Sequence, residues 1–204
     1  MFLNTIKSVL SDNWPILIIF LITLVTLRFF YLRNHREKIV FYKEFITIIS
    51  IFYIFILFQL LTKVELNQNG GYNLVPFTEI FRYEIGSQLF TYNVFGNIIA
   101  FVFFGLIVSA YIKPKTIAPV ITTSLIVSST VEFIQLNIGR SFDVDDIILN
   151  VLGGLAGYLI FIGLTAIKNH LPNVFRRDGL YNVICLIIIV IIAIYLLRAM
   201  GVIS

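Results

Sequence analysis

The sequence contains few charged residues, one cysteine and two histidines, and each scarcity excludes a kind of structure or site. Charged residues make up 13% of the 204-residue chain, whereas a soluble domain usually has about a quarter. The single cysteine, Cys185, excludes a disulfide within the chain. His35 and His170 lie in two different polar connections, so no histidine-rich metal site is expected. The sequence also lacks internal repeats and low-complexity segments.

Apolar residues make up 59% of the chain and gather in long runs. A helix needs about 20 residues to cross the hydrocarbon core of a bilayer, where the backbone must satisfy its own hydrogen bonds. The sequence therefore predicts an all-α, polytopic transmembrane helical bundle of about six spans. The candidate spans are Trp14–Leu32, Phe45–Thr62, Val94–Ile112, Ile117–Leu136, Ile147–Ile167 and Asn182–Met200. No small-x-small cleavage motif follows the first run, so we interpret it as a retained span and not as a signal peptide.

The basic residues indicate the orientation of the spans. Counted by connection, 10 of the 15 lysines and arginines fall on one side of the membrane and 5 on the other. The richer side is expected to be cytoplasmic, which places both termini on the extracytoplasmic side. Of the 11 acidic residues, 8 fall outside or at outer span ends, so we expect the chemistry of the protein there. The net charge of +4 is modest and does not indicate a nucleic-acid partner.

We expect three parts along the chain. Residues 1–72 hold two N-terminal spans and a basic cytoplasmic loop, residues 73–167 an outer loop and three spans, and residues 168–204 a basic loop and the last span. The outer connection 63–92 mixes turn residues with an apolar stretch. This mixture favours a loop that folds back onto the membrane surface.

Two polar segments lie at or before the start of the third span. In residues 73–82, Pro76 favours an extended residue before it and a short helix after it. This segment is either a surface cap or part of a ligand-binding loop. Asn93 is expected to cap the third span, whereas Asn97 lies one turn into the apolar region and needs a partner.

Glu132 and Gln135 lie three residues apart near the outer end of the fourth span. An acidic side chain at that depth must face the bundle interior or a wet cavity, so Glu132 is a candidate functional residue. The alternative is a structural ion pair with Arg140 or Arg82.

The start of the fifth span carries three carboxylates within residues 143–146. Asp143 either joins the helix or caps it, and the helix dipole favours Asp145 and Asp146. Capping explains one or two carboxylates, but three repel one another unless a cation, an arginine or raised pKa values compensate. One stripe of this helix is expected to face other helices, because its glycines permit close approach. The stripe consists of Asp146, Asn150, Gly153 and Gly157.

These residue types favour binding of a phosphorylated lipid headgroup at the outer leaflet. Arg82 and Arg140 can bind phosphate or carboxylate bidentately. Oxygen donors without histidine suit a divalent cation such as Mg²⁺, Mn²⁺ or Ca²⁺, for which the candidate ligands are Glu132, Asp143 and Asp146. A serine hydrolase is poorly supported, because no outward histidine is available to activate a serine.

In these segments the sequence resembles the VanZ-like family, with four motifs in the family's order between about Asn73 and Gly157. The motifs are Asn73-Leu74-Val75-Pro76-Phe77, the helix from Asn97 to Phe104-Gly105, Glu132-Phe133-Ile134-Gln135, and the helix start from Asp143 and Asp146 through Asn150 to Gly153-Gly154. One departure is Phe103, which stands before Phe104-Gly105 where the family usually has a proline.

The resemblance implies a bacterial plasma-membrane protein associated with resistance to teicoplanin, a lipoglycopeptide directed at cell-wall precursors. The resemblance thus implies a part in this resistance, and it leaves open whether the protein catalyses a reaction. We expect the protein to bind or modify an envelope lipid, a lipid-linked cell-wall precursor or teicoplanin itself. The candidate ligand-binding residues are Asn73, Pro76, Phe77, Arg82, Asn97, Glu132, Gln135, Arg140, Asp143, Asp146 and Asn150.

Two other functions stay open. One is a metal-assisted enzyme that acts on a lipid-linked phosphate, with Glu132 or Asp146 as the base. The other is a lipid transporter or flippase, which is less favoured because no ionisable residue lies near the midplane of spans two to five.

Overall fold

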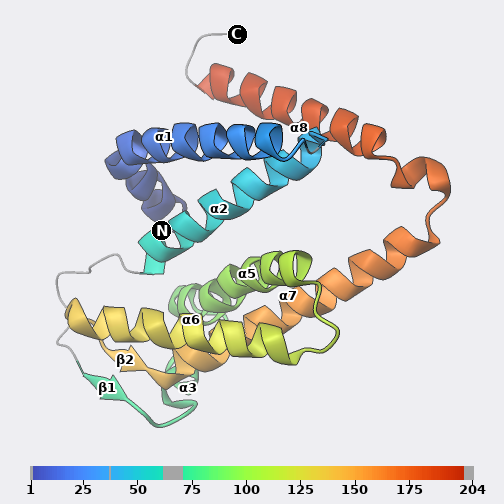
Figure 1. Cartoon of the computed structure of the whole chain (residues 1–204). Coiled ribbons are helices and arrows are strands. Elements are labelled where there is room, and N and C mark those ends of the chain that lie inside the picture. The colour runs from blue at the N-terminus through green and yellow to red at the C-terminus, as the bar shows by residue number, and fades with distance from the viewer. Residues whose placement is uncertain (1, 37, 62–70, 200–204) are drawn as a thin grey trace. The chain divides into compact units, whose positions relative to one another are not determined.

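The computed structural model describes residues 2–36, 38–61 and 71–199 and is predominantly helical (Figure 1). Five of its helices are long and apolar enough to cross a membrane, which confirms the prediction of a helical membrane protein. They are Trp14–Asn34 within α1 (Phe2–Asn34), Phe41–Gln59 within α2 (Phe41–Leu61), Gln88–Ile112, α6 (Ala118–Asn137) and α7 (Val144–His170). The predicted sixth span falls on α8 (Asp178–Ala199), whose apolar stretch Asp178–Ile191 is shorter. The first part of the predicted loop 63–92, and the predicted span ends Thr62 and Met200, lie outside the described residues.

The chain forms two compact units. The first consists of Met1–Trp14 and Phe52–Ala166, and the second of Pro15–Ile51 and Ile167–Ser204. In the second unit, which also contains η2 (Asn173–Arg176), Arg28 Nε lies 2.6 Å from Glu44 Oε2. The hydroxyl of Tyr42 donates to Asp178 Oδ1 at 2.9 Å in the same unit. The pocket described below belongs to the first unit.

The third predicted span is a continuous helical run whose start contains a π-helical turn. It comprises α4 (Gln88–Phe90), the π-turn η1 (Thr91–Phe95) and α5 (Gly96–Ile112). The prediction that Asn93 caps this helix is wrong. Ser87 is extended and its hydroxyl accepts a hydrogen bond from Phe90 N at 3.1 Å, so the helix begins before Asn93 and includes it.

Glycines bring α7 close to the backbone of α5. A Cβ added to Gly153 would overlap the carbonyl of Ile98, and one added to Gly157 would overlap the carbonyl of Val102. Side chains larger than hydrogen at these positions would therefore push the helices apart. The prediction that this stripe of the fifth span faces another helix is confirmed for both glycines.

A short loop structure covers the start of α7. Strand β1 (Tyr72–Asn73) pairs in parallel with β2 (Phe142–Asp143), with Asn73 opposite Asp143. The short helix predicted after Pro76 is α3 (Thr78–Arg82). Figure 1 shows α3 and both strands together at one end of α6 and α7. Gly139, with φ of 90°, makes the turn from α6 toward β2 in a conformation that favours glycine.

Candidate functional site

The carboxylate of Asp145 holds the loop helix α3 in place. Its Oδ1 accepts a hydrogen bond from the backbone N–H of Phe77, and its Oδ2 accepts from Glu79 N at 2.7 Å and Ile80 N at 3.2 Å. These donors belong to the first turn of α3, which has no carbonyl partner for them within the helix. With a side chain 1% exposed, Asp145 therefore acts as a cap supplied from a distant part of the sequence.

Asp143 caps α7 and joins it to β1. Its Oδ1 accepts hydrogen bonds from Asp145 N at 2.8 Å and from Asn73 Nδ2 at 3.0 Å. Because α7 begins at Val144, the first of these is the N-cap interaction that was one of the two predicted roles for Asp143. The backbone N–H of Asp143 in turn donates to Glu132 Oε2 at 2.9 Å.

Two amide side chains connect α7 to its neighbouring helices. Asn97, on α5, donates from Nδ2 to Asp146 Oδ1 at 2.6 Å, which supplies the partner that its place in an apolar helix requires. Asn150 donates from Nδ2 to Ser128 Oγ on α6 at 2.9 Å. The stripe of α7 thus contacts α5 through Asp146 and α6 through Asn150.

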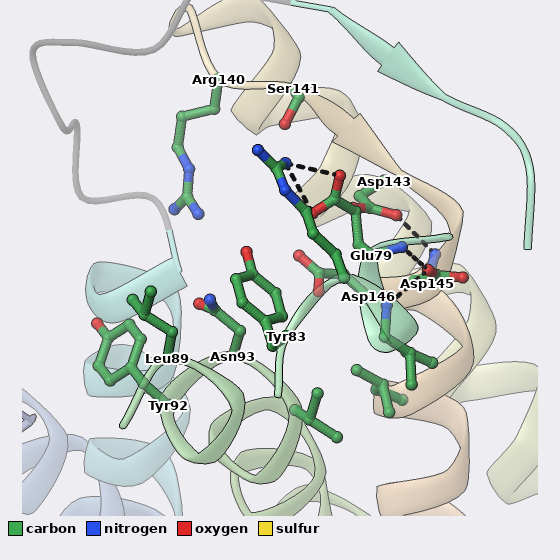
Figure 2. Close-up of a pocket in the computed structure, with 14 residues that line it drawn as sticks. Glu79, Tyr83, Leu89, Tyr92, Asn93, Arg140, Ser141, Asp143, Asp145 and Asp146 are labelled. Carbon is green, nitrogen blue, oxygen red and sulfur yellow. Dashed lines mark hydrogen bonds and ion pairs between the residues drawn. The ribbon is translucent and has the colours of Figure 1, made fainter. Parts of the chain in front are cut away.

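A pocket of about 450 Å³ lies among α3, the start of the third span and the start of α7. Figure 2 shows Arg140 reaching into it from the turn after α6, with the carboxylates of Glu79, Asp143, Asp145 and Asp146 gathered on the other side. The pocket is lined by Glu79, Ile80, Arg82, Tyr83, Leu89, Tyr92, Asn93, Val94, Arg140, Ser141, Asp143, Asp145, Asp146 and Leu149. Side chains of both charge signs therefore face one space.

The acidic side chains of the pocket differ in how many of their oxygens accept hydrogen bonds from the protein. Asp145 uses both oxygens on the loop backbone. Glu79 accepts from Arg82 NH1 at 3.0 and 3.2 Å, so the predicted alternative of an Arg82 pair with Glu132 is wrong. Among the described residues, Asp146 receives a hydrogen bond at Oδ1 from Asn97. Asp143 and Asp146 both accept their described hydrogen bonds at Oδ1, so the Oδ2 atom of each is a carboxylate position available to a ligand.

The π-turn brings Tyr92, Asn93 and Val94 to the pocket wall. A π-turn contains one more residue per turn than an α-helix, so it rotates the residues before it relative to those after it. The sequence gives no signal for this turn. Asn93 was consequently predicted as a cap, although it lies in the pocket.

Two groups, the Asp143 carboxyl in β2 and the Tyr83 phenol in the loop, have pKa values that are shifted from their ordinary values. Burial raises the pKa of the Asp143 carboxyl above its ordinary value, while hydrogen bonds from Asp145 and Asn73 oppose that shift. Burial and the neighbouring charge of Glu79 raise the pKa of the Tyr83 phenol. Tyr83 is therefore a neutral hydroxyl at physiological pH, able to donate a hydrogen bond into the pocket.

The predicted ligand-binding residues divide into three groups. Arg82, Arg140, Asp143 and Asp146 line the pocket. The side chains of Pro76 and Phe77 are exposed, and Gln135 is 3% exposed with its backbone carbonyl accepting from Arg140 N at 2.9 Å. The others make the hydrogen bonds that fix the loop and the helices, namely Asn73, Asn97, Glu132 and Asn150.

The prediction omitted several residues that line the pocket. Asp145 is one of three clustered carboxylates in the sequence, and nothing local distinguishes the acid that holds the loop from its neighbours. Glu79 lies three residues before Arg82, a spacing that indicates a helical ion pair. No comparable signal marks Tyr83, Tyr92 or Ser141.

The three candidate metal ligands each accept a hydrogen bond from the protein. Glu132 accepts from Asp143 N, Asp143 from Asn73 and Asp145 N, and Asp146 from Asn97. Within the part of the chain that the structure describes, no three His, Cys, Asp or Glu side chains are arranged to hold a metal ion.

A comparison with known protein families matches residues 16–168 to the family model described as VanZ/LLP1. The matched segment contains the four sequence motifs and every residue that lines the pocket. No curated protein and no solved structure matches the chain.

Proposed function

Because the chain belongs to the VanZ/LLP1 family, we propose that it is a cell-envelope membrane protein whose pocket binds a lipid headgroup. The ligand is an envelope lipid or a lipid-linked cell-wall precursor, and its headgroup carries a phosphate together with a cationic group or a bridging cation. The distribution of basic residues supports placing the pocket on the extracytoplasmic side of the plasma membrane.

One observation carries this proposal, namely that both charge signs line a pocket of about 450 Å³. This volume lies within the usual range for small-molecule sites. Arg82 and Arg140 come from separate segments and suit a phosphate between them, since guanidinium groups bind phosphate oxygens in pairs. The available oxygen of Asp146 suits an ammonium group, or a divalent cation that bridges to the phosphate.

The proposed binding extends to a role in tolerance to teicoplanin. Teicoplanin is lipophilic and acts on cell-wall precursors at the outer leaflet. A protein that binds the headgroup of such a precursor, or the antibiotic itself, would reduce the encounter between the two. We favour binding over turnover because Asp143 and Asp145, two of the acids that line the pocket, accept hydrogen bonds from backbone N–H groups of the protein itself.

The test of this proposal is antibiotic susceptibility in a Gram-positive host that expresses the chain. We expect the intact chain to raise the inhibitory concentration of teicoplanin more than that of vancomycin. Arg140→Gln and Asp146→Asn should abolish the effect at matched membrane levels. Asn at position 146 can still accept from Asn97, so loss of the effect would report the charge. The matched control is Glu84→Gln, which changes an exposed acid of the same loop outside the pocket.

Unchanged susceptibility with the intact chain would contradict the proposed role. An effect that survives both pocket substitutions would move the function away from this pocket.

A further inference from the structure

The loop between the second and third spans exposes large apolar side chains on a part of the protein outside the spans. We call these residues the loop surface: Tyr72, Leu74, Val75, Phe77, Phe81 and Ile85, which are between 50% and 88% exposed. Large apolar side chains gathered on the surface of one loop are typical of contact with a partner or a membrane. We propose that the loop surface rests in the interfacial layer of the bilayer, at the end of α5, α6 and α7 where the pocket lies.

The exposure of this surface is fixed by the structure and is not the result of a loose loop. Strand pairing with β2 holds Tyr72 and Asn73, and the carboxylate of Asp145 holds the start of α3. Phe77 has φ of 68°, a left-handed conformation that is unfavourable for a bulky residue. Such a conformation persists where surrounding contacts maintain it, here the hydrogen bond from Phe77 N to Asp145.

The short helix α3 presents its two sides to different environments. Glu79, Ile80 and Arg82 line the pocket. The rings of Phe77 and Phe81 are tilted by 45° relative to each other, with centroids 6.3 Å apart, and Phe81 is 80% exposed. The element that forms one wall of the pocket therefore also carries the most prominent aromatic residue of the loop surface.

Lipid, and not a protein partner, is the occupant that the observations favour. The loop surface continues along the chain into the exposed apolar side of the third span, through Leu89, Phe95 and Ile99. The described part of the loop also leads directly into the third span, which is long and apolar enough to cross a membrane, so we expect lipid to be adjacent at that end. Aromatic side chains are enriched at the boundary between acyl chains and headgroups, where an apolar ring and a polar backbone both find partners.

This placement has a consequence for the pocket. With Phe77 and Phe81 at the acyl boundary, Arg82 and Glu79 on the adjoining side of α3 lie at the depth of lipid headgroups. A lipid could then enter the pocket laterally with its headgroup, without leaving the leaflet. The inference concerns where the loop lies and does not depend on headgroup binding.

The test places a single tryptophan on the loop surface of the full-length protein in lipid nanodiscs. Trp14 is the one tryptophan of the chain, so Trp14→Phe gives a silent background. Phe81→Trp reports the loop, and Lys115→Trp, on an exposed residue of the connection between α5 and α6, serves as the aqueous control. Ile85→Trp, at an 88% exposed position, is a second reporter in case the first variant folds poorly.

We expect iodide to quench Phe81→Trp and Ile85→Trp several-fold less than Lys115→Trp. Phosphatidylcholine with bromine near the headgroup end of its acyl chains should quench the two loop reporters and not the control. Iodide quenching of the loop reporters equal to that of Lys115→Trp, in nanodiscs that contain only this protein and lipid, would overturn the inference. That result would instead indicate a surface that is open to water until a protein partner covers it.

Discussion

At the scale of the residue, the three carboxylates at the start of α7 have different structural roles. Asp143 caps its own helix, Asp145 holds a helix elsewhere in the chain, and Asp146 contacts α5 and lines the pocket. N–H groups of the protein donate to all three carboxylates, and hydrogen bonds to a carboxylate favour its charged form, which opposes their mutual repulsion.

Removal of the Asp145 carboxylate should release the loop. Asp145→Ala leaves the N–H groups of Phe77, Glu79 and Ile80 without their acceptor, and we expect a loss of about 2 kcal/mol in the free energy of unfolding. Thermal unfolding in detergent measures the loss, and limited proteolysis should cut the loop faster. The control Glu84→Ala, at an exposed acid in the same loop, should change stability by less than about 0.5 kcal/mol. Equal stability of the two variants would mean that Asp145 does not hold the loop.

The raised pKa of Asp143 predicts a particular pH dependence of stability. Because the folded state favours the protonated carboxyl, its contribution is most favourable at low pH. That contribution is lost as the pH rises from the ordinary aspartate value through the raised pKa of the folded protein. In Asp143→Asn the amide oxygen can still accept from Asn73 and Asp145 N, but it does not titrate.

The measurement for Asp143 is the difference in melting temperature between the intact protein and Asp143→Asn across mildly acidic pH. We expect the substituted protein to lack part of the decline in stability with rising pH. Parallel curves for the two proteins would show that Asp143 titrates as it does in the unfolded chain.

At the scale of the element, the apolar runs predicted the helices well, and local signals predicted their ends less well. The predicted span Ile117–Leu136 corresponds closely to the helix Ala118–Asn137 of the structure. The agreement is close because a long apolar run in lipid has no alternative to a helix. The third span begins earlier than predicted, since the cap is Ser87, and its π-turn has no local sequence signal. Tertiary contacts decide such a turn, so the sequence alone predicts the span and not the orientation of Asn93.

The site was predictable in its location but not in its organisation. The polar motifs indicated the end of the helices at which the pocket lies, because polar groups within apolar spans need partners. The partners themselves are distant along the chain: Asp145 lies 66 residues after Glu79, and Asp146 lies 49 residues after Asn97. Local periodicity could not distinguish residues that line the pocket from residues that support it.

The close approach of α5 and α7 gives a prediction for the glycines of α7. Gly157→Ala would place a methyl group against the backbone of Val102, and we expect a loss of about 1–3 kcal/mol in the free energy of unfolding. Gly163→Ala, in the same helix, meets no atom within 4 Å and should leave stability unchanged or raise it by up to about 1 kcal/mol. Thermal unfolding of the two variants in detergent measures the contrast. Similar melting temperatures would contradict the described approach of the helices.

At the scale of the whole molecule, the basic residues predict which end of the helices faces outward. Ser141 is exposed at the pocket end and Lys115 is exposed in the connection between α5 and α6. In a Cys185→Ser background, a membrane-impermeant maleimide should label Ser141→Cys in intact cells and Lys115→Cys only after permeabilisation. The reverse pattern would place the pocket on the cytoplasmic side and remove the basis for outer-leaflet binding.

The proposed function requires the same pocket to hold a phosphate and a positive group. Arg140 belongs to the turn before β2 and Asp146 to α7, and both line the pocket. We therefore expect each of the two charges to contribute separately to ligand affinity.

The most direct measurement is the equilibrium binding of fluorescent phosphatidylethanolamine, whose headgroup carries a phosphate and an ammonium, to purified protein in detergent. We expect saturable binding by the intact protein. Arg140→Gln and Asp146→Asn should each weaken the binding about tenfold, equivalent to about 1.4 kcal/mol, and Lys115→Gln should leave it unchanged. Repeating the titration with EDTA and with phosphatidylglycerol, which lacks the ammonium, separates direct contact from a bridging cation. Absence of saturable binding, or equal affinity in all four proteins, would contradict the account.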